Sequence, residues 1–387
     1  MNIPQKNAAS VQNQPVQSSN CGAGEGVSEQ NPQPDAGHDF DKLAWREEGL
    51  PFNAFGAALR RRFGGRVQRV SIDAGFTCPN VDGAVTRGGC NFCDNRSFSP
   101  SRRVRLASVL DQLNRGITSV RERYSNVAGF IAYLQPATNT YGPIDQLETL
   151  YRAALNVSSQ VVGLAIGTRP DCVPDEVLDL IDDLAKHHYV SLEYGMQTIH
   201  DRSLDWMNRG HYHASMIDAM QRSAGRDFET CAHIILGVPG ESHDDMMQTA
   251  DQIGPLQVDA VKLHNLYAVH GTPLGEEVLA GKVQMMEREA YVHTVVDFLE
   301  RIPPHVIVER VSGDAPPDFL IAPKWCHQKS ALRLEIENEF RRRGSRQGDR
   351  YVAGQHAALP VGSVDQTPAA IAQRIQKART LPVLKFD

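Results

Sequence analysis

VAGFIAYLQPATNTYGPIDQLETLYRAALNVSSQVVGLAIG, residues 127–167, contains one complete strand–helix–strand unit. The apolar runs 127–134 and 160–167 have the length and composition of buried strands, and residues 143–156 between them have helical periodicity. Strands joined through a helix form a right-handed βαβ unit and lie parallel. This stretch therefore predicts an α/β fold with a parallel sheet.

The same alternation recurs along the chain from about residue 66. Further candidate strands cover residues 66–73, 189–195, 230–237 and 258–266. Further candidate helices cover residues 106–124, 174–188 and about 283–301. Strand and helix alternate about six times, which predicts either a barrel or an open doubly wound sheet. In both forms the chemistry gathers at the carboxyl ends of the strands.

Composition narrows the class of protein. Of the 387 residues, 41% are hydrophobic and 22% are charged, and the formal net charge is -6, an ordinary balance for a globular protein. This balance excludes a wholesale basic nucleic-acid binder, so any RNA surface must be local. No window approaches eighteen uninterrupted apolar residues, hence no membrane span is predicted. The seven cysteines show no disulfide framework and the first residues show no secretory signal, which favours a cytoplasmic location.

Four regions are expected. Residues 1–38, rich in Gln, Asn, Ser, Gly and Pro, predict a disordered tail because they cannot bury enough apolar surface. Residues 39–302 form the core of alternating strands and helices. Residues 303–350 form a C-terminal extension that includes a possible seventh strand, HVIVERVSG (305–313), and residues 351–387 form a linker and a terminal helix.

Three cysteines lie close together in CPNVDGAVTRGGCNFC, residues 78–93. Cys78, Cys90 and Cys93 follow the first candidate strand, so they belong to the carboxyl edge of the sheet. A structural zinc site needs a fourth ligand, a cytosolic disulfide is disfavoured on redox grounds, and a redox CxxC pair leaves Cys78 without a role. An iron–sulfur cluster held by three thiolates fits better, because it leaves one iron open for an exogenous ligand.

Segments beyond the cysteines carry a resemblance to a known family. They are RGGCNFC, YLQPATNTY, GTRPDC, LEYGMQTIHDRSLDWMNRGH, ILGVPGES, VKLHNLYAVHGTPL and ERVSGDAP. From about residue 45 to 350 the chain resembles the YhcC-like branch of the radical S-adenosylmethionine (SAM) superfamily, which is related to the catalytic subunit of Elongator. Eleven residues separate Cys78 from Cys90, where the superfamily usually has three, and the YhcC-like proteins are similar in carrying this longer loop.

The resemblance implies a fold, cofactors and a chemistry. The fold is a partial (β/α)6 TIM-like barrel of the radical SAM type. Cys78, Cys90 and Cys93 would ligate a [4Fe–4S] cluster whose open iron binds SAM. An electron from a flavodoxin- or ferredoxin-like donor would then cleave SAM to methionine and a 5′-deoxyadenosyl radical. Relatives in the Elongator branch act on the wobble uridine of tRNA, so a tRNA base is the implied substrate.

Residues at other strand ends are SAM ligands implied by the resemblance. Gln135 and Thr138 follow the second strand, where the superfamily presents polar groups to the SAM amino group, although the familiar Gly-Gly-Glu is absent. A role in the turn is equally open for Thr138 and for the neighbouring Asn139. Gly237 and Pro239 end the fifth strand and would line the adenine face, or would form an ordinary tight turn.

The fourth strand carries the carboxylate Glu193 and, after it, Gln197. A carboxylate inside an apolar strand is costly to bury without a partner. By resemblance, Glu193 would hold the SAM ribose or amine, with Gln197 beside it; the alternative is a salt bridge to Arg169 or Arg209. Arg209 also lies in the Elongator-like motif NRGH and is a further implied SAM contact.

Lys262 and His264 alternate with apolar residues in the sixth strand, so both point to one face, which is the lumen if the sheet is a barrel. Both are candidates for contact with SAM or substrate, and His264 is alternatively an ordinary core histidine. Cys326 is a third candidate for a catalytic role. Cys172 and Cys231 lack partners at ligand spacing and are expected to be core thiols.

Positive charge is concentrated in residues 60–69, 101–105 and 341–350. These segments are either solvated arginines or an electrostatic footprint for phosphates. The leading hypothesis is a radical SAM enzyme that modifies tRNA. The alternatives are a radical SAM enzyme that acts on a small metabolite or a protein side chain, and a non-enzymatic, zinc-stabilised RNA-binding module.

Overall fold

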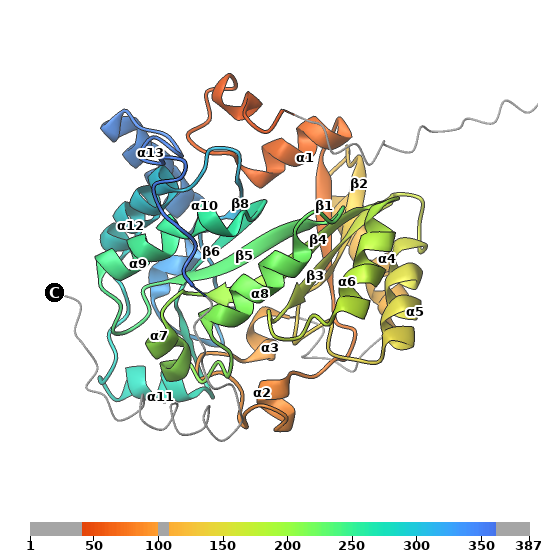
Figure 1. Cartoon of the computed structure of the whole chain (residues 1–387), viewed down its shortest axis with the longest axis horizontal. Helices are drawn as coiled ribbons and strands as arrows, with labels where there is room; N and C mark the ends of the chain where they lie inside the picture. Colours follow the sequence, from red (N-terminus) through yellow and green to blue (C-terminus); the bar gives the residue numbers. More distant parts are fainter. Residues whose placement is uncertain (1–40, 100–107, 361–387) are drawn as a thin grey trace, which may run out of the picture. The chain divides into compact units, whose positions relative to one another are not determined.

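A seven-stranded parallel sheet forms the centre of the computed structural model, which describes residues 41–99 and 108–360 (Figure 1). The strand order is β1-β2-β3-β4-β5-β6-β8, so the strands are neighbours in the order in which the chain makes them. The sheet is a half-barrel, which confirms the predicted α/β class and the partial barrel. The tail predicted over 1–38, the basic segment 101–105 and the terminal helix expected within 351–387 lie outside the described residues.

All six candidate strands are confirmed, and the possible seventh joins the sheet beside β6. The strands of the sheet are β1 (Val67–Ile72), β2 (Gly129–Leu134), β3 (Val161–Thr168), β4 (Tyr189–Gln197), β5 (Glu229–Leu236), β6 (Ala260–Asn265) and β8 (Ile307–Arg310). A separate antiparallel pair is formed by β7 (Ala268–Val269) and β9 (Leu320–Ala322).

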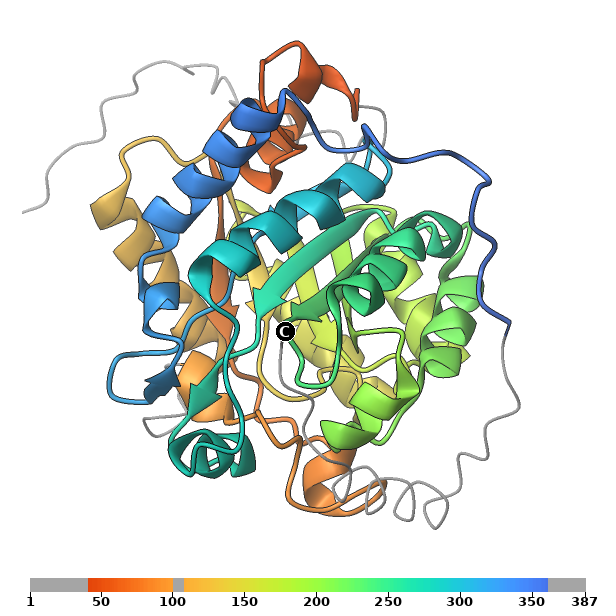
Figure 2. The ribbon, with the colours of Figure 1, turned by 90° about the vertical axis from the view of Figure 1, so that its left-hand side faces the viewer.

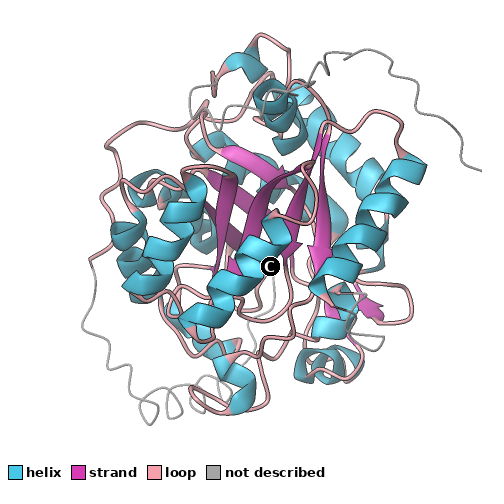
Figure 3. Cartoon of the chain, turned by 90° about the vertical axis from the view of Figure 1, so that its right-hand side faces the viewer, coloured by secondary structure: helices cyan, strands magenta, loops and turns pink. Residues whose placement is uncertain are grey.

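Helices connect the strands and surround the sheet (Figure 3). Those between β1 and β8 are α2 (Pro79–Asp82), α3 (Asn95–Phe98), α4 (Val109–Arg123), α5 (Ile144–Leu155), α6 (Asp175–Ala185), α7 (Asp201–Trp206), α8 (His213–Ser223), α9 (His243–Asp251), α10 (Ile253–Leu256), α11 (Pro273–Leu279) and α12 (Arg288–Arg301). The terminal ones are α1 (Phe55–Phe63) and α13 (Lys329–Arg343), with 3-10 helices at Ala44–Arg46 and Lys324–His327. The candidate helices are confirmed in α4, α5, α6 and α12.

Strand β2 shows why the strand signals are continuous apolar runs. All six of its residues are buried. Phe130 and Ala132 belong to the main core beneath the helices, whereas Ile131 and Tyr133 belong to a second cluster on the other face. A strand that is covered on both faces has no polar side to alternate with, as is usual in parallel sheets.

Helix α1 closes the amino-terminal end of the lumen. Its Leu59 packs in one cluster with Ile131, and its Ala58 packs in another with Cys231, both of which face the lumen. Phe55 contributes to both clusters. This helix is the floor of the half-barrel, and the pocket described below lies at the opposite end.

The segment after residue 302 is built into this fold. β8 is the last strand of the sheet, and α13 packs along α12 (Figure 2), where Leu332, Ile336 and Phe340 are buried. The predicted boundary between a core at 39–302 and an extension at 303–350 stays a prediction, and the extension supplies one edge of the sheet. Among the described residues, no helix is long and apolar enough to cross a membrane.

Candidate functional site

A pocket of about 580 Å³ lies at the carboxyl ends of the strands. Residues of β2, β3, β4, β5, β6 and β8 line it. Cys78, Cys90 and Cys93 line the same pocket. The structure therefore brings the three clustered cysteines together with the strand ends, as the sequence predicts.

The cysteine loop is shaped by glycine and tied to α7. Gly88 and Gly89 have φ angles of +84° and +77°, in the left-handed region that side chains disfavour. The N–H of Asn91 donates to the carbonyl of Met207, and its side-chain Nδ2 donates to the carbonyl of Trp206. These bonds hold the long loop against the mouth of the half-barrel.

Two side-chain donors reach the sulfur of Cys90. Asn80 Nδ2 lies 3.4 Å from Cys90 Sγ, and Arg209 Nη1 lies 3.5 Å from it. The guanidinium of Arg209 is oriented by a backbone carbonyl of β4, which accepts from Nη2 at 2.9 Å. Burial, then the nearby Cys90 and Cys78, raises the pKa of Cys93, so this thiol keeps its proton unless a bound metal displaces it.

The donor set at this pocket consists of three thiols, with side-chain N–H donors on one sulfur. Among the residues with described positions, no group of three or more His, Cys, Asp or Glu is arranged to hold a metal ion. Thiolates are the ligands of iron–sulfur clusters, and N–H donors to their sulfurs tune such clusters, so the chemistry of these residues fits a cluster.

Comparison with known proteins identifies the family. The model of the Radical SAM superfamily matches residues 85–253, and that of the Radical_SAM C-terminal domain matches residues 258–342. The chain is 36% identical over 293 residues to Protein YhcC of Escherichia coli (strain K12), a match that covers 76% of this chain and 93% of YhcC. The chain belongs to the radical SAM superfamily. The prediction of a YhcC-like radical SAM enzyme is thereby confirmed.

Two more distant similarities complete the comparison. The radical SAM protein is 24% identical over 178 residues to the tRNA uridine(34) acetyltransferase of Methanocaldococcus jannaschii, a match over 45% of this chain and 32% of that protein. The structure of Elp3 from Methanocaldococcus infernus matches with a TM-score of 0.54 at 18% identity, over 73% of this chain and 64% of that chain. The structural match supports the radical SAM half-barrel fold.

Gln135 and Thr138, which follow β2, are two of the SAM ligands that the resemblance implies. Both line the pocket. The hydroxyl of Thr138 is buried and has no hydrogen-bond partner among the described residues, so it is available to a ligand. Asn139 has the turn role instead. Its Nδ2 donates to the carbonyls of Leu134 at 3.0 Å and Gly167 at 2.9 Å, which ties the ends of β2 and β3 together.

The two other predicted strand-end contacts differ in their placement. Gln197 lines the pocket and has a φ of +71° where the pairing of β4 with β5 shifts register. Gly237 and Pro239 are not among the lining residues of this pocket. The N–H of Gly237 donates to Met246 Sδ on α9 at 3.3 Å, so this turn packs against a helix. The predicted adenine contact of Gly237 and Pro239 stays a prediction.

Glu193 pairs with neither Arg169 nor Arg209, so the salt bridges considered from the sequence are wrong. Its Oε1 lies 2.8 Å from Arg69 Nη1, and its Oε2 lies 2.7 Å from Lys262 Nζ. Glu193 is buried and points into the lumen, where side chains of β1 and β6 meet it. Arg169, just past the end of β3, pairs instead with Asp171 at 2.7 Å.

Three further residues join this cluster of charges. Glu309 lies 3.3 Å from Lys262 Nζ and also pairs with Arg69. The amine of Lys262 donates to Tyr133 Oη at 2.8 Å, and His233 Nε2 lies 2.7 Å from Glu193 Oε2. We call these six residues the lumen network: Arg69, Tyr133, Glu193, His233, Lys262 and Glu309.

The lumen network keeps its charges although it is buried. Burial would raise the pKa of Glu193, but Arg69 and Lys262 hold it well below its ordinary value. Burial would likewise lower the pKa of Lys262, but Glu193 raises it above the ordinary value. Lys262 faces the lumen as predicted, yet its amine is engaged by the network and is not on the pocket wall.

His264 does line the pocket, beside Arg310. Burial, then Arg310, holds the pKa of His264 well below its ordinary value, so the ring is neutral near pH 7. Arg310 Nη2 is within hydrogen-bonding distance of the ring nitrogens of His264. The ring of His264 lies 5.2 Å from that of His233, centroid to centroid, which connects it to the lumen network.

Cys172, Cys231 and Cys326 lie off the pocket wall of the radical SAM protein. Cys326 is fully buried, and burial raises the pKa of its thiol to about 11. Its neighbours His327 and Lys329 line the pocket in its place. Cys231 is buried as predicted, but Cys172 is only half-buried, because it lies in the turn after β3 rather than within an element.

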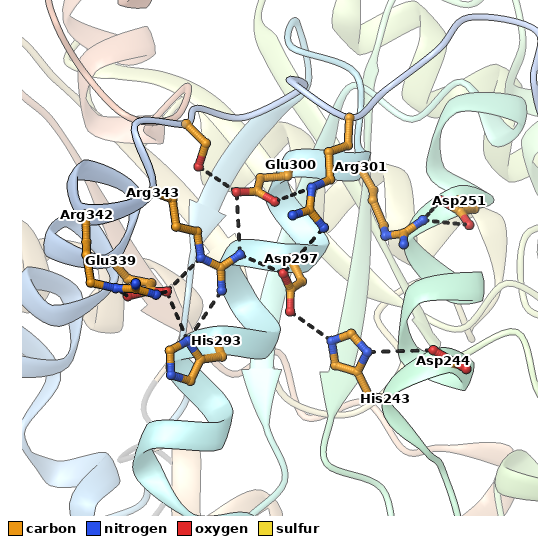
Figure 4. Close-up of polar contacts among 12 residues, drawn as sticks. His243, Asp244, Asp251, His293, Asp297, Glu300, Arg301, Glu339, Arg342 and Arg343 are labelled. Carbon is orange, nitrogen blue, oxygen red and sulfur yellow. Dashed lines mark hydrogen bonds and ion pairs between the residues drawn. The ribbon is translucent and has the colours of Figure 1, made fainter.

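The basic segment 341–350 is largely paired within the fold. Figure 4 shows Arg343 between α13 and α12, where it reaches Asp297 at 2.6 Å and Glu339 at 2.6 Å. Arg350 reaches Glu300 at 2.9 Å. Arg343 and Arg350 thus tie this segment to α12, whereas Arg341 and Arg342 are exposed, and Arg342 pairs with Glu339 of its own helix.

The segment 60–69 is also used by the fold of the radical SAM protein. Arg62 Nη1 lies 2.7 Å from Glu229, Arg69 is part of the lumen network, and the guanidinium of Arg66 lies 4.4 Å from the ring centroid of Tyr124. The fold uses part of each of these two basic segments, while other arginines in them, Arg60, Arg66, Arg341 and Arg342, are exposed, so the phosphate footprint stays a prediction. The third lies outside the described residues.

Sequence reasoning missed several residues of the site, among them His233, Arg310 and Asn80. His233 shares a strand face with Cys231 at a spacing of two residues, which is a usable signal for a lumen position. Arg310 lies inside the quoted motif ERVSGDAP, where its role was not considered. Asn80 gave no signal, because its contact with Cys90 depends on how the loop folds.

Proposed function

We propose that this radical SAM enzyme holds a [4Fe–4S] cluster through Cys78, Cys90 and Cys93, cleaves SAM reductively and modifies a tRNA base. The family implies both cofactors. The observation that carries the proposal is the meeting of three thiols at one lumen pocket, with the N–H groups of Asn80 and Arg209 directed at the sulfur of Cys90.

Different residues of the pocket would bind the two cofactors and exclude water from them. When bound, the cluster and SAM supply one-electron chemistry that the side chains lack. The N–H donors on the Cys90 sulfur would stabilise negative charge there. The hydroxyl of Thr138 and the amide of Gln135, which line the pocket, would hold the amino acid part of SAM. The lumen network fills the space beneath, which keeps bulk water away from the reacting atoms.

We propose that the substrate is a tRNA base, the wobble uridine. Support comes from the similarity to a protein named tRNA uridine(34) acetyltransferase, of which this chain spans 32%. A pocket of about 580 Å³ is of the size that binds small ligands, and a base flipped out of its loop could enter it. A flavodoxin- or ferredoxin-like protein is the proposed electron donor.

Anaerobic reconstitution with iron and sulfide tests the cofactors. We expect a brown protein that forms 5′-deoxyadenosine from SAM when a reductant is added. Cys90→Ala should lose colour and product, whereas Cys172→Ala, the matched control off the pocket wall, should keep both. Zinc as the sole metal would contradict the cluster and favour the zinc-stabilised module, whereas full colour and product in Cys90→Ala would remove Cys90 from the proposed ligands.

Nucleoside analysis tests the substrate. Total tRNA from a strain without the gene should lack one modified nucleoside when digested and examined by mass spectrometry. The wild-type gene should restore it, and the gene for Cys90→Ala should not. Unchanged nucleosides together with intact SAM cleavage would refute the tRNA substrate and favour a small metabolite or a protein side chain.

A further inference from the structure

The formal charges inside the lumen do not balance. Arg69 and Lys262 are matched by Glu193 and Glu309, which pair with them directly. Arg310 adds a third cation to the same space and lines the pocket. Within the described ranges, it forms no ion pair with a carboxylate, and its Nε is buried without a hydrogen-bond partner. Arg310 is half-buried, so water screens its charge only in part, and a ligand that supplies an anion would stabilise it.

Arg310 is held in one orientation. It lies at the end of β8, where it is the register partner of Lys262 in β6. Its Nη2 contacts the ring of His264, which lies against that of His233. Gly313 packs over the guanidinium, since a Cβ at that position would stand 3.2 Å from Nη2. The surroundings therefore fix the guanidinium toward the pocket before any ligand arrives.

We propose that Arg310 binds a carboxylate on the base that enters the pocket, so that the substrate is an acid-bearing nucleoside of tRNA. This inference rests on the proposed function. A guanidinium binds a carboxylate through two parallel N–H bonds, which combines charge with orientation. Arg310 is joined through two histidine rings to the lumen network, so a base that enters the lumen would meet it, whereas backbone phosphates that stay outside the pocket would not.

The carboxylate of SAM is the competing source of the same chemistry. Arg209 is a better partner for it, because its guanidinium is next to the Cys90 sulfur, where SAM would bind the cluster. Arg209 also forms no ion pair with a carboxylate among the residues described. The two guanidiniums can thus bind two different anions. Arg209 would bind the carboxylate of SAM, and Arg310 would bind the carboxylate of the substrate.

The first test is chemical. Nucleosides from the tRNA of the gene-deleted strain are treated with a methyl-esterifying reagent and examined by mass spectrometry. The precursor that accumulates should gain one methyl ester, because it carries a free carboxylate. A precursor that gains none would overturn this inference and leave the proposed function standing. Tests in which no nucleoside changes at all would overturn both.

The second test uses the reconstituted enzyme and tRNA from that strain. Arg310→Gln should lower kcat/KM for tRNA by about 10- to 100-fold, as expected for the loss of charge-assisted hydrogen bonds. Arg310→Lys should recover part of this loss. Arg152→Gln, a matched control on the outer helix α5 whose arginine pairs with Glu148 and Asp183, should behave as wild type.

Two results of this second test would overturn the inference. In one, the affinity of Arg310→Gln for SAM, measured by equilibrium binding, falls by the same factor as kcat/KM for tRNA. That result would assign Arg310 to the SAM carboxylate. The other is a change in how tRNA binding depends on salt: if the slope of log K against log salt concentration becomes about one unit shallower, a phosphate contact has been lost. A carboxylate contact on the base predicts neither result.

Discussion

Replacement of Lys262 by Met tests whether the lumen network balances its own charges. The methionine keeps most of the aliphatic length of the lysine and removes the ammonium group. In the native structure that group lies 2.7 Å from Glu193, 3.3 Å from Glu309 and 2.8 Å from the hydroxyl of Tyr133. Its loss leaves the two carboxylates with one arginine, Arg69, and with the hydrogen bond between His233 and Glu193.

The expected cost follows from this imbalance. Removal of one partner from a buried ion pair typically costs about 3–5 kcal/mol, because the remaining charge is left without compensation. The double variant Lys262→Met/Glu193→Gln restores one cation, Arg69, to one anion, Glu309. We therefore expect the double variant to be more stable than Lys262→Met alone, with a coupling energy of about 1–3 kcal/mol.

Urea unfolding of the cluster-free protein, followed by circular dichroism, measures both free energies. Lys282→Met, at an exposed lysine, is the control and should change the free energy of unfolding by less than about 0.5 kcal/mol. The deficit of Lys262→Met should shrink as the pH is lowered, because protonation of Glu193 removes the unpaired charge. A cost below about 1 kcal/mol, the range of exposed pairs, would refute the reasoning. A double variant no more stable than the single one would refute it too.

Three further predictions concern other parts of the molecule. Burial lowers the pKa of His213 to about 4 from 6.5, so unfolding should become about 3 kcal/mol easier between pH 6.5 and 4, and His213→Phe should lose this pH dependence in urea titrations at each pH. Arg209→Gln should shift the midpoint potential of the cluster to more negative values in an EPR-monitored redox titration, because it removes an N–H donor from the Cys90 sulfur; an unchanged potential would contradict this role. Phe340→Ala, in the core, should lower the free energy of unfolding by about 3–5 kcal/mol, whereas Leu334→Ala, on the exposed side of the same helix, should lower it by under about 1 kcal/mol. If the two variants unfold at equal urea midpoints, α13 is not part of the core.

The parts of the fold that the sequence predicts are those with a local signal. Strand β2 is buried on both faces and is therefore an unbroken apolar run, and helix α5 has the periodicity of one covered face. The three cysteines were found because they lie within sixteen residues of one loop. Even β8 was visible as a candidate, since Ile307 and Val308 are a β-branched pair at its start.

The parts that could not be predicted depend on contacts between distant segments. Glu193 was recognised as unusual, but its partner Arg69 is 124 residues away and lies in a segment that resembled a basic surface patch. The arginines of 341–350 resembled a second patch. Arg343 instead pairs with Asp297, because α13 packs along α12. Charge along the sequence says little about which charges meet in the folded chain.

The ends of the half-barrel set a mechanical property of the site. Main-chain hydrogen bonds run without interruption from β1 to β8, whereas these two edge strands are linked across the lumen by the side chains of Arg69 and Glu309. Rotation of side chains is cheap compared with rupture of a β-ladder. The gap between the edges can therefore widen or narrow by small amounts while the rest of the wall stays rigid. Such an adjustable seam would let one scaffold close around molecules of different size.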